Sequence, residues 1–481
     1  MPKSAAPGSS ALEHAPEVPR RGPPPTAANS AQKRLAGLDG IRGLAALFVV
    51  VNHVFLRAFH GYPADTAPFW AAWFIYGRFA VVVFIVLSGF SLAVSAARSG
   101  WRLAALSRFA QRRAWRILPP YWAALVFSLL VAWLILPQPG QGSPNAKSVF
   151  VNGLLLQDLF EARSPNRAFW TIAIEAQLYV VFPLLLLIIR RVNAIVMVTA
   201  VTLVVATIGL LGPHFPRMTP LLTRSSPDLA ALFAVGVLAA GILTTTQRRK
   251  SWPWHWLALA AALPVIATIS AKGSVWTIDH LFWVDLALGP SIGCLLAAIA
   301  TDRPASLVRA LDTRPLRSLG SISYSLYLTH GPIVVVVYEE IVAGRVRQGV
   351  PAFLVALTIV LPLTIAFARR FADAFEIPFR NHRGWGPLRD ALTHRAEGGA
   401  ASGAEVSEQV IDDERRPQDG FPDSPQVRPD SVGVLPVVHE GSNESQTVDR
   451  ASAASAGTRS LRPALSGMVS TSRDGVSGVP G

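Results

Sequence analysis

The sequence predicts an all-α, polytopic integral membrane protein with about ten transmembrane helices, on three observations. Hydrophobic residues make up 51% of the 481 residues and charged residues only 15%, and the mean hydropathy is +0.38. Apolar runs long enough to cross a bilayer recur along the chain. Lys and Arg gather between these runs, as membrane topology requires, so the net charge of +14 does not indicate nucleic acid as a partner.

The apolar runs divide the chain into ten predicted spans and two tails. The spans are about residues 44–60, 76–97, 119–136, 169–189, 194–212, 228–245, 254–270, 282–300, 321–341 and 351–371. Even-numbered connections carry more Lys and Arg than odd-numbered ones, which predicts that both termini are cytoplasmic. A transmembrane domain at 34–384 is therefore expected between disordered cytoplasmic tails at 1–33 and 385–481, which lack the residues to build a core.

The first span carries polar side chains inside an apolar segment. Arg42 and His53 are eleven residues apart, about three helical turns, so they share one helix face roughly 16 Å apart along its axis. Asp39 precedes Arg42 by about one turn. An imidazole takes a proton from an attacking hydroxyl near neutral pH, but a buried histidine bonded to a neighbouring helix explains the position equally well. Arg42 alone is explained by a boundary arginine that reaches the interface.

The densest basic segment is RFAQRRAWRILPPYW, before the third span. Arg113 and Arg116 are three residues apart, on one helical face just before a break predicted at Pro119 and Pro120. Guanidinium groups match phosphate oxygens, so this pair suits a phosphorylated ligand. Arginines at this position also set topology and bind anionic lipid headgroups, and that interpretation is kept for Arg108 and Arg112.

Two later spans carry further candidate residues. Glu175 lies inside the fourth span with Tyr179 one turn beyond, and it needs a partner: His53, an arginine or a bound acceptor. Tyr327 and His330 in the ninth span share a helical stripe, although tyrosines near interfaces are ordinarily aromatic-belt residues. In the second span, Ser88 and Gly89 are interpreted as packing residues, and Arg78 as a site residue or an outer-interface residue.

Five segments in order along residues 34–380 resemble the motifs of the bacterial acyltransferase-3 family, integral membrane O-acyltransferases of the O-antigen, peptidoglycan and macrolide acetylase type. They are LDGIRGLAALFVVVNH, VVFIVLSGFSL, the Arg-x-x-Arg of RFAQRRAWRILPPYW, FWTIAIEAQLY and SYSLYLTH, and the closing FEIPFR also matches the family's end. The chain departs from the pattern at Ala176, Leu178 and Thr329, where Glu, Phe and Trp are usual in the family.

The resemblance implies transfer of an acyl group, usually acetyl from acetyl-CoA, to a hydroxyl of a saccharide, cell-envelope glycan, glycolipid or sugar-bearing metabolite. It implies a bacterial cytoplasmic-membrane enzyme, surrounded by lipid, with no metal. His53, Glu175 and Arg42 are then expected to be catalytic, with Glu175 orienting His53, and Arg113 and Arg116 to hold coenzyme A. The expected substrate-binding residues are Asp39, Tyr179, Tyr327 and His330. The tail after 385 is expected to leave no room for the esterase-like domain that some family members carry.

Two other functions use the same residue types. A proton-coupled transporter or exporter also needs buried His, Arg and Glu, and it predicts pH-driven flux without thioester cleavage. An inactive scaffold that retains the fold predicts that His53→Ala affects stability alone. The arginine pair at 113 and 116 favours the acyltransferase over the transporter, which gains little from it.

Overall fold

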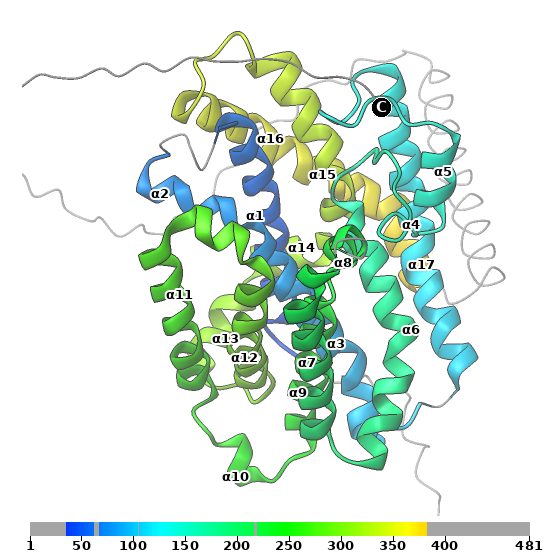
Figure 1. The fold of residues 1–481 in the computed structure, drawn as a ribbon, viewed down its shortest axis with the longest axis vertical. Helices are drawn as coiled ribbons and strands as arrows, with labels where there is room; N and C mark the ends of the chain where they lie inside the picture. Colours follow the sequence, from blue (N-terminus) through cyan, green and yellow to red (C-terminus); the bar gives the residue numbers. More distant parts are fainter. Residues whose placement is uncertain (1–34, 62–66, 104, 216–218, 382–481) are drawn as a thin grey trace, which may run out of the picture. The chain divides into compact units, whose positions relative to one another are not determined.

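The computed structural model describes residues 35–61, 67–103, 105–215 and 219–381 and shows a bundle of helices (Figure 1). Every element in these ranges is helical, which confirms the predicted all-α class. The helices are α1 (Leu38–Ala58), α2 (Phe69–Ala72), η2 (Trp73–Tyr76), α3 (Gly77–Arg98), α4 (Leu106–Leu134), α5 (Ala146–Gly153), α6 (Phe169–Arg191), α7 (Ala194–Leu211), η3 (Gly212–His214), α8 (Thr219–Ser225), α9 (Asp228–Ala240), η4 (Gly241–Thr244), α10 (Gln247–Lys250), α11 (Trp254–Asp279), α12 (Leu281–Ala300), α13 (Ala305–Leu311), α14 (Arg314–Ser321), α15 (Ser323–Val336), η5 (Val337–Val342), α16 (Val350–Phe371), η6 (Ala372–Glu376) and α17 (Ile377–Asn381). The two predicted tails, 1–33 and 385–481, lie outside the described residues.

The described helices account for the predicted spans. Eight are long and apolar enough to cross a membrane. A ninth crossing is broken, because α14 meets α15 and its extension η5 at a bend of 70° around Ile322. The remaining predicted span corresponds to the shorter apolar helix Asp228–Thr244, which joins α9 and η4. The polytopic architecture is therefore confirmed, with one span bent and one short.

Helix α4 differs from the expectation at its start. The break predicted at Pro119 and Pro120 is wrong, because α4 runs through both prolines from Leu106 to Leu134. Each proline removes one helical hydrogen bond, but its fixed φ is compatible with a helix. Burial of Ile117, Pro120 and Tyr121 in the bundle holds the helix together across this point. The arginines that precede the prolines therefore project from a rigid helix.

Glycines allow two helices of the core to meet backbone to backbone. A Cβ atom on Gly89 of α3 would lie 2.2 Å from the carbonyl oxygen of Phe233 in α9, and one on Gly236 would lie 1.9 Å from that of Val86. Neither position accepts a larger residue without movement of the helix. This contact fixes α3, and with it Ser88, relative to the rest of the bundle.

The start of α1 is seated against α14 in the same way. A Cβ atom on Gly320 would lie 2.0 Å from the carbonyl oxygen of Asp39, so the two backbones are in direct contact. This contact places Asp39 and Arg42 beside the bend between α14 and α15.

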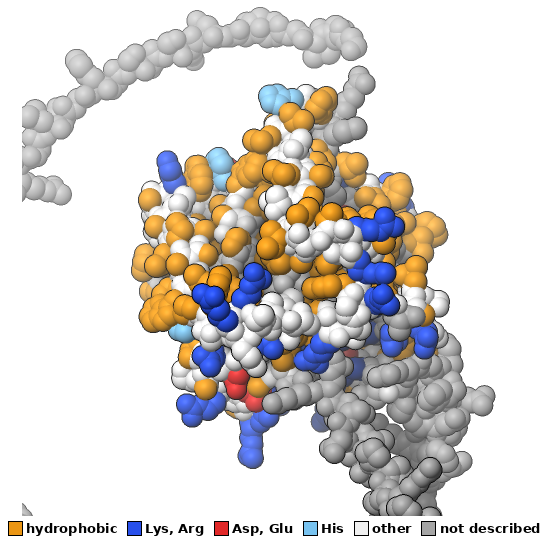
Figure 2. Space-filling view, turned by 90° about the horizontal axis from the view of Figure 1, so that it is seen from below, with side chains coloured by type: hydrophobic (Ala, Val, Ile, Leu, Met, Phe, Trp, Pro, Cys, Tyr) orange, Lys and Arg blue, Asp and Glu red, His pale blue; other side chains and the backbone are white. Residues whose placement is uncertain are grey.

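One end of the bundle is basic. Figure 2 views the molecule from the end at which α10 lies in Figure 1, and Lys and Arg side chains are spread over that face. Its exposed members include Arg248 and Arg249 of α10, and Arg303, which lines a shallow pocket together with Arg248. Their position agrees with the connections that the positive-inside rule predicts to be cytoplasmic. The orientation of the termini stays a prediction.

Candidate active site

A cavity of about 360 Å³ lies between α1, α3, α4, α6, the bend of α14 and α15, and the segment from η6 to α17. Its polar lining contains four arginines, three carboxylates, three tyrosines and several hydroxyls. They are Asp39, Arg42, Ser88, Ser91, Arg113, Arg116, Thr171, Glu175, Tyr179, Ser321, Ser323, Tyr324, Tyr327, Glu376 and Arg380. The structure thus brings together seven of the nine predicted site residues, from four motifs that are far apart in sequence.

Arg42 is held from two helices at one wall of the cavity. Its guanidinium donates to the Asp39 carboxylate over 3.1 Å, one turn earlier in α1, and to the Ser91 hydroxyl of α3 over 2.7 Å. Both charged side chains keep about a quarter of their surface exposed. The pair is therefore anchored while its charge still faces the cavity, which contrasts with an arginine that merely reaches the interface.

Glu175 receives two short hydrogen bonds in the middle of the cavity wall. Ser88 of α3 donates over 2.6 Å and Tyr179 of α6 over 2.5 Å, both to the same carboxylate oxygen. Ser88 and Tyr179 also lie 3.1 Å apart, so the three groups form a closed network. The expected link from Glu175 to His53 is replaced by this network. Ser88 is a cavity residue that the sequence interpretation assigned to packing, while its neighbour Gly89 does pack as expected.

Arg113 and Arg116 face the cavity without carboxylate partners. Among the described residues neither takes part in an ion pair, and Arg113 lies over the rings of Tyr179 and Phe109 at 5.7 and 5.9 Å. Arg116 repels both Arg113 and Arg42 electrostatically. Positive charges gathered in this way favour an anionic ligand with several negative charges. Arg108 and Arg112 of the same helix are exposed and lie outside the cavity lining.

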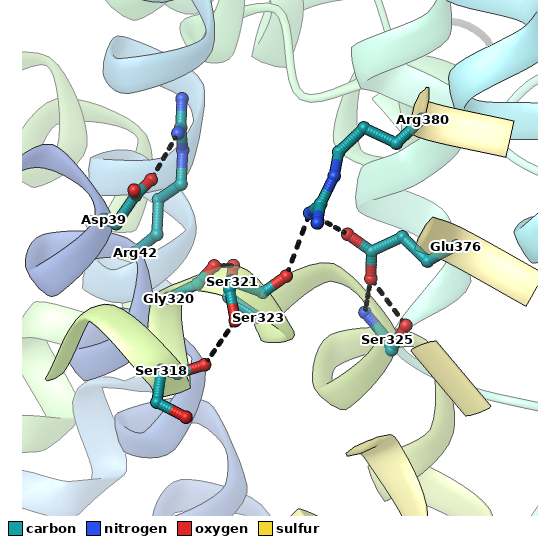
Figure 3. Close-up of polar contacts among 9 residues, drawn as sticks. All are labelled: Asp39, Arg42, Ser318, Gly320, Ser321, Ser323, Ser325, Glu376 and Arg380. Atoms are coloured by element: carbon teal, nitrogen blue, oxygen red, sulfur yellow. Dashed lines mark hydrogen bonds and ion pairs between the residues drawn. The ribbon is translucent and has the colours of Figure 1, made fainter. Parts of the chain in front are cut away.

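A second arginine–carboxylate pair, missed at the sequence level, stands across the bend from Arg42 (Figure 3). Glu376 accepts from the backbone N–H and the hydroxyl of Ser325, at 3.2 and 2.6 Å, and pairs with Arg380 at 3.4 Å. Arg380 also donates to the carbonyl of Ser321 at 3.1 Å. The sequence placed this segment at the end of the domain; the i,i+4 spacing of the pair is the signal that could have identified it.

Hydroxyl groups join the helices that form another part of the cavity wall. Tyr327 of α15 and Thr171 of α6 lie 2.6 Å apart through their side-chain oxygens, and both side chains are buried. Tyr324, one turn earlier on α15, bonds the carbonyl of Ile117 in α4 at 3.1 Å. Tyr327, predicted to bind substrate, and Tyr324 therefore tie three helices together around the cavity.

The two histidines do not reach this cavity. His53 and His330 have ring centroids 4.8 Å apart, and neither is among the described residues that line it. His330 is fully buried and donates from Nδ1 to the carbonyls of Tyr327 and Leu326 at 2.8 and 3.2 Å, since a carbonyl can only accept. Its Nε2 atom is then the basic nitrogen, and it has no hydrogen-bond partner among the described residues. His330, expected in the cavity wall, thus lies outside the described lining, with its ring centroid 5.7 Å from that of Tyr327.

Arg78 belongs to neither of the two environments expected for it. Its guanidinium pairs with Asp285 of α12 at 2.5 Å and with Asp228 of α9 at 2.8 Å, and lies 5.3 Å from the ring centroid of Trp170. Both aspartates are almost completely buried. This cluster joins α3, α6, α9 and α12 outside the cavity lining.

Comparison with known proteins decides the family. A sequence model described as "Acyltransferase domain" matches residues 35–369, which include every predicted site residue. This chain belongs to the acyltransferase-3 family. No solved structure matches it with significance.

Three curated relatives of this family member are known O-acetyltransferases or putative ones. It is 22% identical to the peptidoglycan O-acetyltransferase OatA of Listeria monocytogenes over 63% of this chain and 50% of the relative. It is 24% identical to the O-acetyltransferase OatA of Staphylococcus aureus over 72% and 57%, and to the putative peptidoglycan O-acetyltransferase YrhL of Bacillus subtilis over 63% and 49%. The match thus spans about half the length of these relatives.

Proposed function

We propose that this membrane protein transfers an acyl group, most often acetyl, from acyl-CoA to a hydroxyl of a saccharide, cell-envelope glycan, glycolipid or sugar-bearing metabolite. The observation that carries the proposal is the cavity with four arginines, of which Arg113 and Arg116 have no carboxylate partner among the described residues. Coenzyme A brings several phosphate charges, which match this surplus of guanidinium groups. Membership of the acyltransferase-3 family and the names of its relatives support the reaction class.

In this proposal the donor enters from the basic end of the bundle, which faces the cytoplasm. Arg113 and Arg116 hold coenzyme phosphates, and Arg42, fixed by Asp39 and Ser91, binds the donor or polarises the thioester carbonyl. The Glu175–Ser88–Tyr179 network keeps a negative charge close to Arg113 and so sets that arginine's position. The chain is then a multi-pass protein of the bacterial cytoplasmic membrane with both termini inside.

The chemical step needs a base for the acceptor hydroxyl, because an alcohol is a poor nucleophile toward a thioester. His53 takes the hydroxyl proton while the oxygen attacks the acyl carbon. A carbon–oxygen bond forms, the carbon–sulfur bond breaks, and the coenzyme leaves as the free thiol after it receives a proton. His330, whose ring lies against that of His53, supports this base and does not contact the donor.

The test uses inside-out membrane vesicles with labelled acetyl-CoA and an acceptor-rich extract, comparing the unmodified protein with His53→Ala. We expect thiol release and transfer of label to an extractable saccharide or glycolipid, both lost in the variant although it still inserts in the membrane. Full activity of His53→Ala would remove this mechanism. Absence of thiol release from acetyl-CoA and longer acyl-CoAs would favour the proton-coupled transporter.

A further inference from the structure

Two residues of the cavity lining, Tyr327 of α15 and Thr171 of α6, are joined by a side-chain hydrogen bond. Tyr327 and Thr171 are 6% and 5% exposed, and their oxygens are 2.6 Å apart. Thr171 has one hydroxyl proton and also lies 3.1 Å from the carbonyl of Ala168, which can only accept. The Tyr327 hydroxyl is therefore the donor in the bond between α15 and α6.

The Tyr327 ring contacts both the cavity lining and the histidine pair. On the cavity side it meets Phe84, a lining residue, edge to face at 5.7 Å between centroids. Its other neighbour is His330, also at 5.7 Å, and His330 in turn lies against His53. Tyr327 is thus a cavity residue that also contacts the histidine pair, and neither histidine is among the described residues that line the cavity.

We infer that the Tyr327–Thr171 bridge determines which hydroxyl receives the acyl group, by keeping the histidine base away from the donor thioester until an acceptor binds. The inference rests on the proposed acyl-CoA reaction. An acceptor hydroxyl that takes the place of Thr171 as the partner of Tyr327 opens the bridge and arrives beside the histidines at the same time. Water lacks the additional contacts that would hold the bridge open, so hydrolysis to free acid and thiol stays slow.

The first test measures coupling in the same vesicles. Tyr327→Phe and Thr171→Val each keep the shape of the side chain and remove the bridging hydroxyl. We expect the ratio of thiol released to acyl groups found on acceptor to rise several-fold in both. Tyr324→Phe is the matched control, because its hydroxyl bonds the Ile117 carbonyl and not Thr171; whatever its rate, its ratio should stay that of the unmodified protein. A ratio that is unchanged in both bridge variants overturns the coupling role.

A second measurement reports the barrier without any turnover. Cys294 is the sole cysteine, so a Cys294→Ala background with His330→Cys carries one thiol, beside Tyr327. A small water-soluble thiol reagent should label it slowly, and several-fold faster when Thr171→Val or Tyr327→Phe is added. Equal labelling rates would show that the bridge closes nothing. If acyl-CoA is not cleaved at all, the proposed function fails, and this labelling still decides the barrier.

Discussion

At the scale of single residues, the site depends on side chains that fix charged groups rather than on the charged groups alone. Ser88 shows this most clearly, since its hydroxyl donates to Glu175 over 2.6 Å from a different helix. A hydrogen bond to a charged group contributes about 1.5–3 kcal/mol. Glu175 without Ser88 keeps the bond from Tyr179 but loses its link to α3.

Ser88→Ala is therefore expected to lower kcat/KM for acyl-CoA by roughly tenfold or more, as the loss of one charged hydrogen bond implies. The substitution removes one oxygen atom, so insertion and thermal stability in detergent should change little. Ser95→Ala, at an exposed position of the same helix, is the control and should match the unmodified enzyme. Equal activity of the two variants would show that the Glu175 network has no part in the reaction.

Asp158 gives a pH dependence outside the spans, in the connection between α5 and α6. Its side chain is 3% exposed, one carboxylate oxygen has no hydrogen-bond partner among the described residues, and burial raises its pKa to about 7. The folded protein then holds a proton that the unfolded chain releases near pH 4. Stability is fully present below that pH and falls as pH rises toward 7, by up to about 1.4 kcal/mol per pH unit.

We expect the thermal unfolding temperature in detergent to be higher at pH 5 than at pH 8, and this difference to shrink in Asp158→Asn, which keeps the shape and removes the titration. Other titrating groups also make the unfolding temperature depend on pH. The quantity to compare is therefore the change in unfolding temperature from pH 5 to pH 8 in the unmodified protein and in Asp158→Asn. An identical pH dependence in both would contradict a buried, protonated Asp158.

At the scale of helices, close glycine contacts set the positions of the cavity walls. Gly236→Val places a side chain where even a Cβ atom would lie 1.9 Å from the Val86 carbonyl oxygen, so α3 and α9 must separate. Overpacking of this kind costs about 1–3 kcal/mol or more. We expect a lower thermal unfolding temperature together with lost activity, because Ser88 moves with α3.

The matched control is Gly153→Ala in α5, where a Cβ atom meets nothing within 4 Å. It should leave stability unchanged or raise it slightly, since alanine favours a helix over glycine by about 0.5–1 kcal/mol. A Gly236→Val protein as stable as this control would refute the account of the α3–α9 contact.

The sequence predicted the helices well and their mutual arrangement only in part. Hydropathy defines each span because the thickness of a bilayer sets the length of the apolar run. Helical spacing then indicated which helix face carries Arg42, Arg113 or Glu175. Contacts between helices leave no such period in the sequence. Ser88 meets Glu175 across 87 positions, and Arg380 of α17 lies beside the bend of α14 and α15, where it donates to the carbonyl of Ser321.

The same limitation explains the histidines and α4. Helical spacing placed His330 on the stripe of Tyr327, but it cannot show that His330 lies beside the Tyr327 ring and outside the described lining. The two prolines of α4 predicted a break from local chemistry, whereas burial of the surrounding residues against neighbouring helices keeps the helix continuous.

At the scale of the whole molecule, we propose that a phosphorylated donor enters from the basic end of the bundle and binds in this one cavity. Helices α1, α4 and α6 and the segment from η6 to α17 bring charges from distant motifs to that cavity. Arg113 and Arg116 lack carboxylate partners among the described residues, whereas Arg108 and Arg112 of the same helix are exposed and lie outside the cavity lining. All four are arginines of one helix and differ only in position. Substituting one pair or the other therefore distinguishes donor binding in the cavity from a general effect of positive charge.

The measurement that tests this claim most directly is acyl-CoA binding and turnover by Arg113→Ala with Arg116→Ala, compared with Arg108→Ala with Arg112→Ala. Both pairs remove the same charge from α4. The account predicts that the first pair raises KM for acyl-CoA at least about tenfold, from the loss of about 1.5–3 kcal/mol per charged contact, while the second leaves it nearly unchanged. Equal effects of the two pairs would contradict a donor site in this cavity.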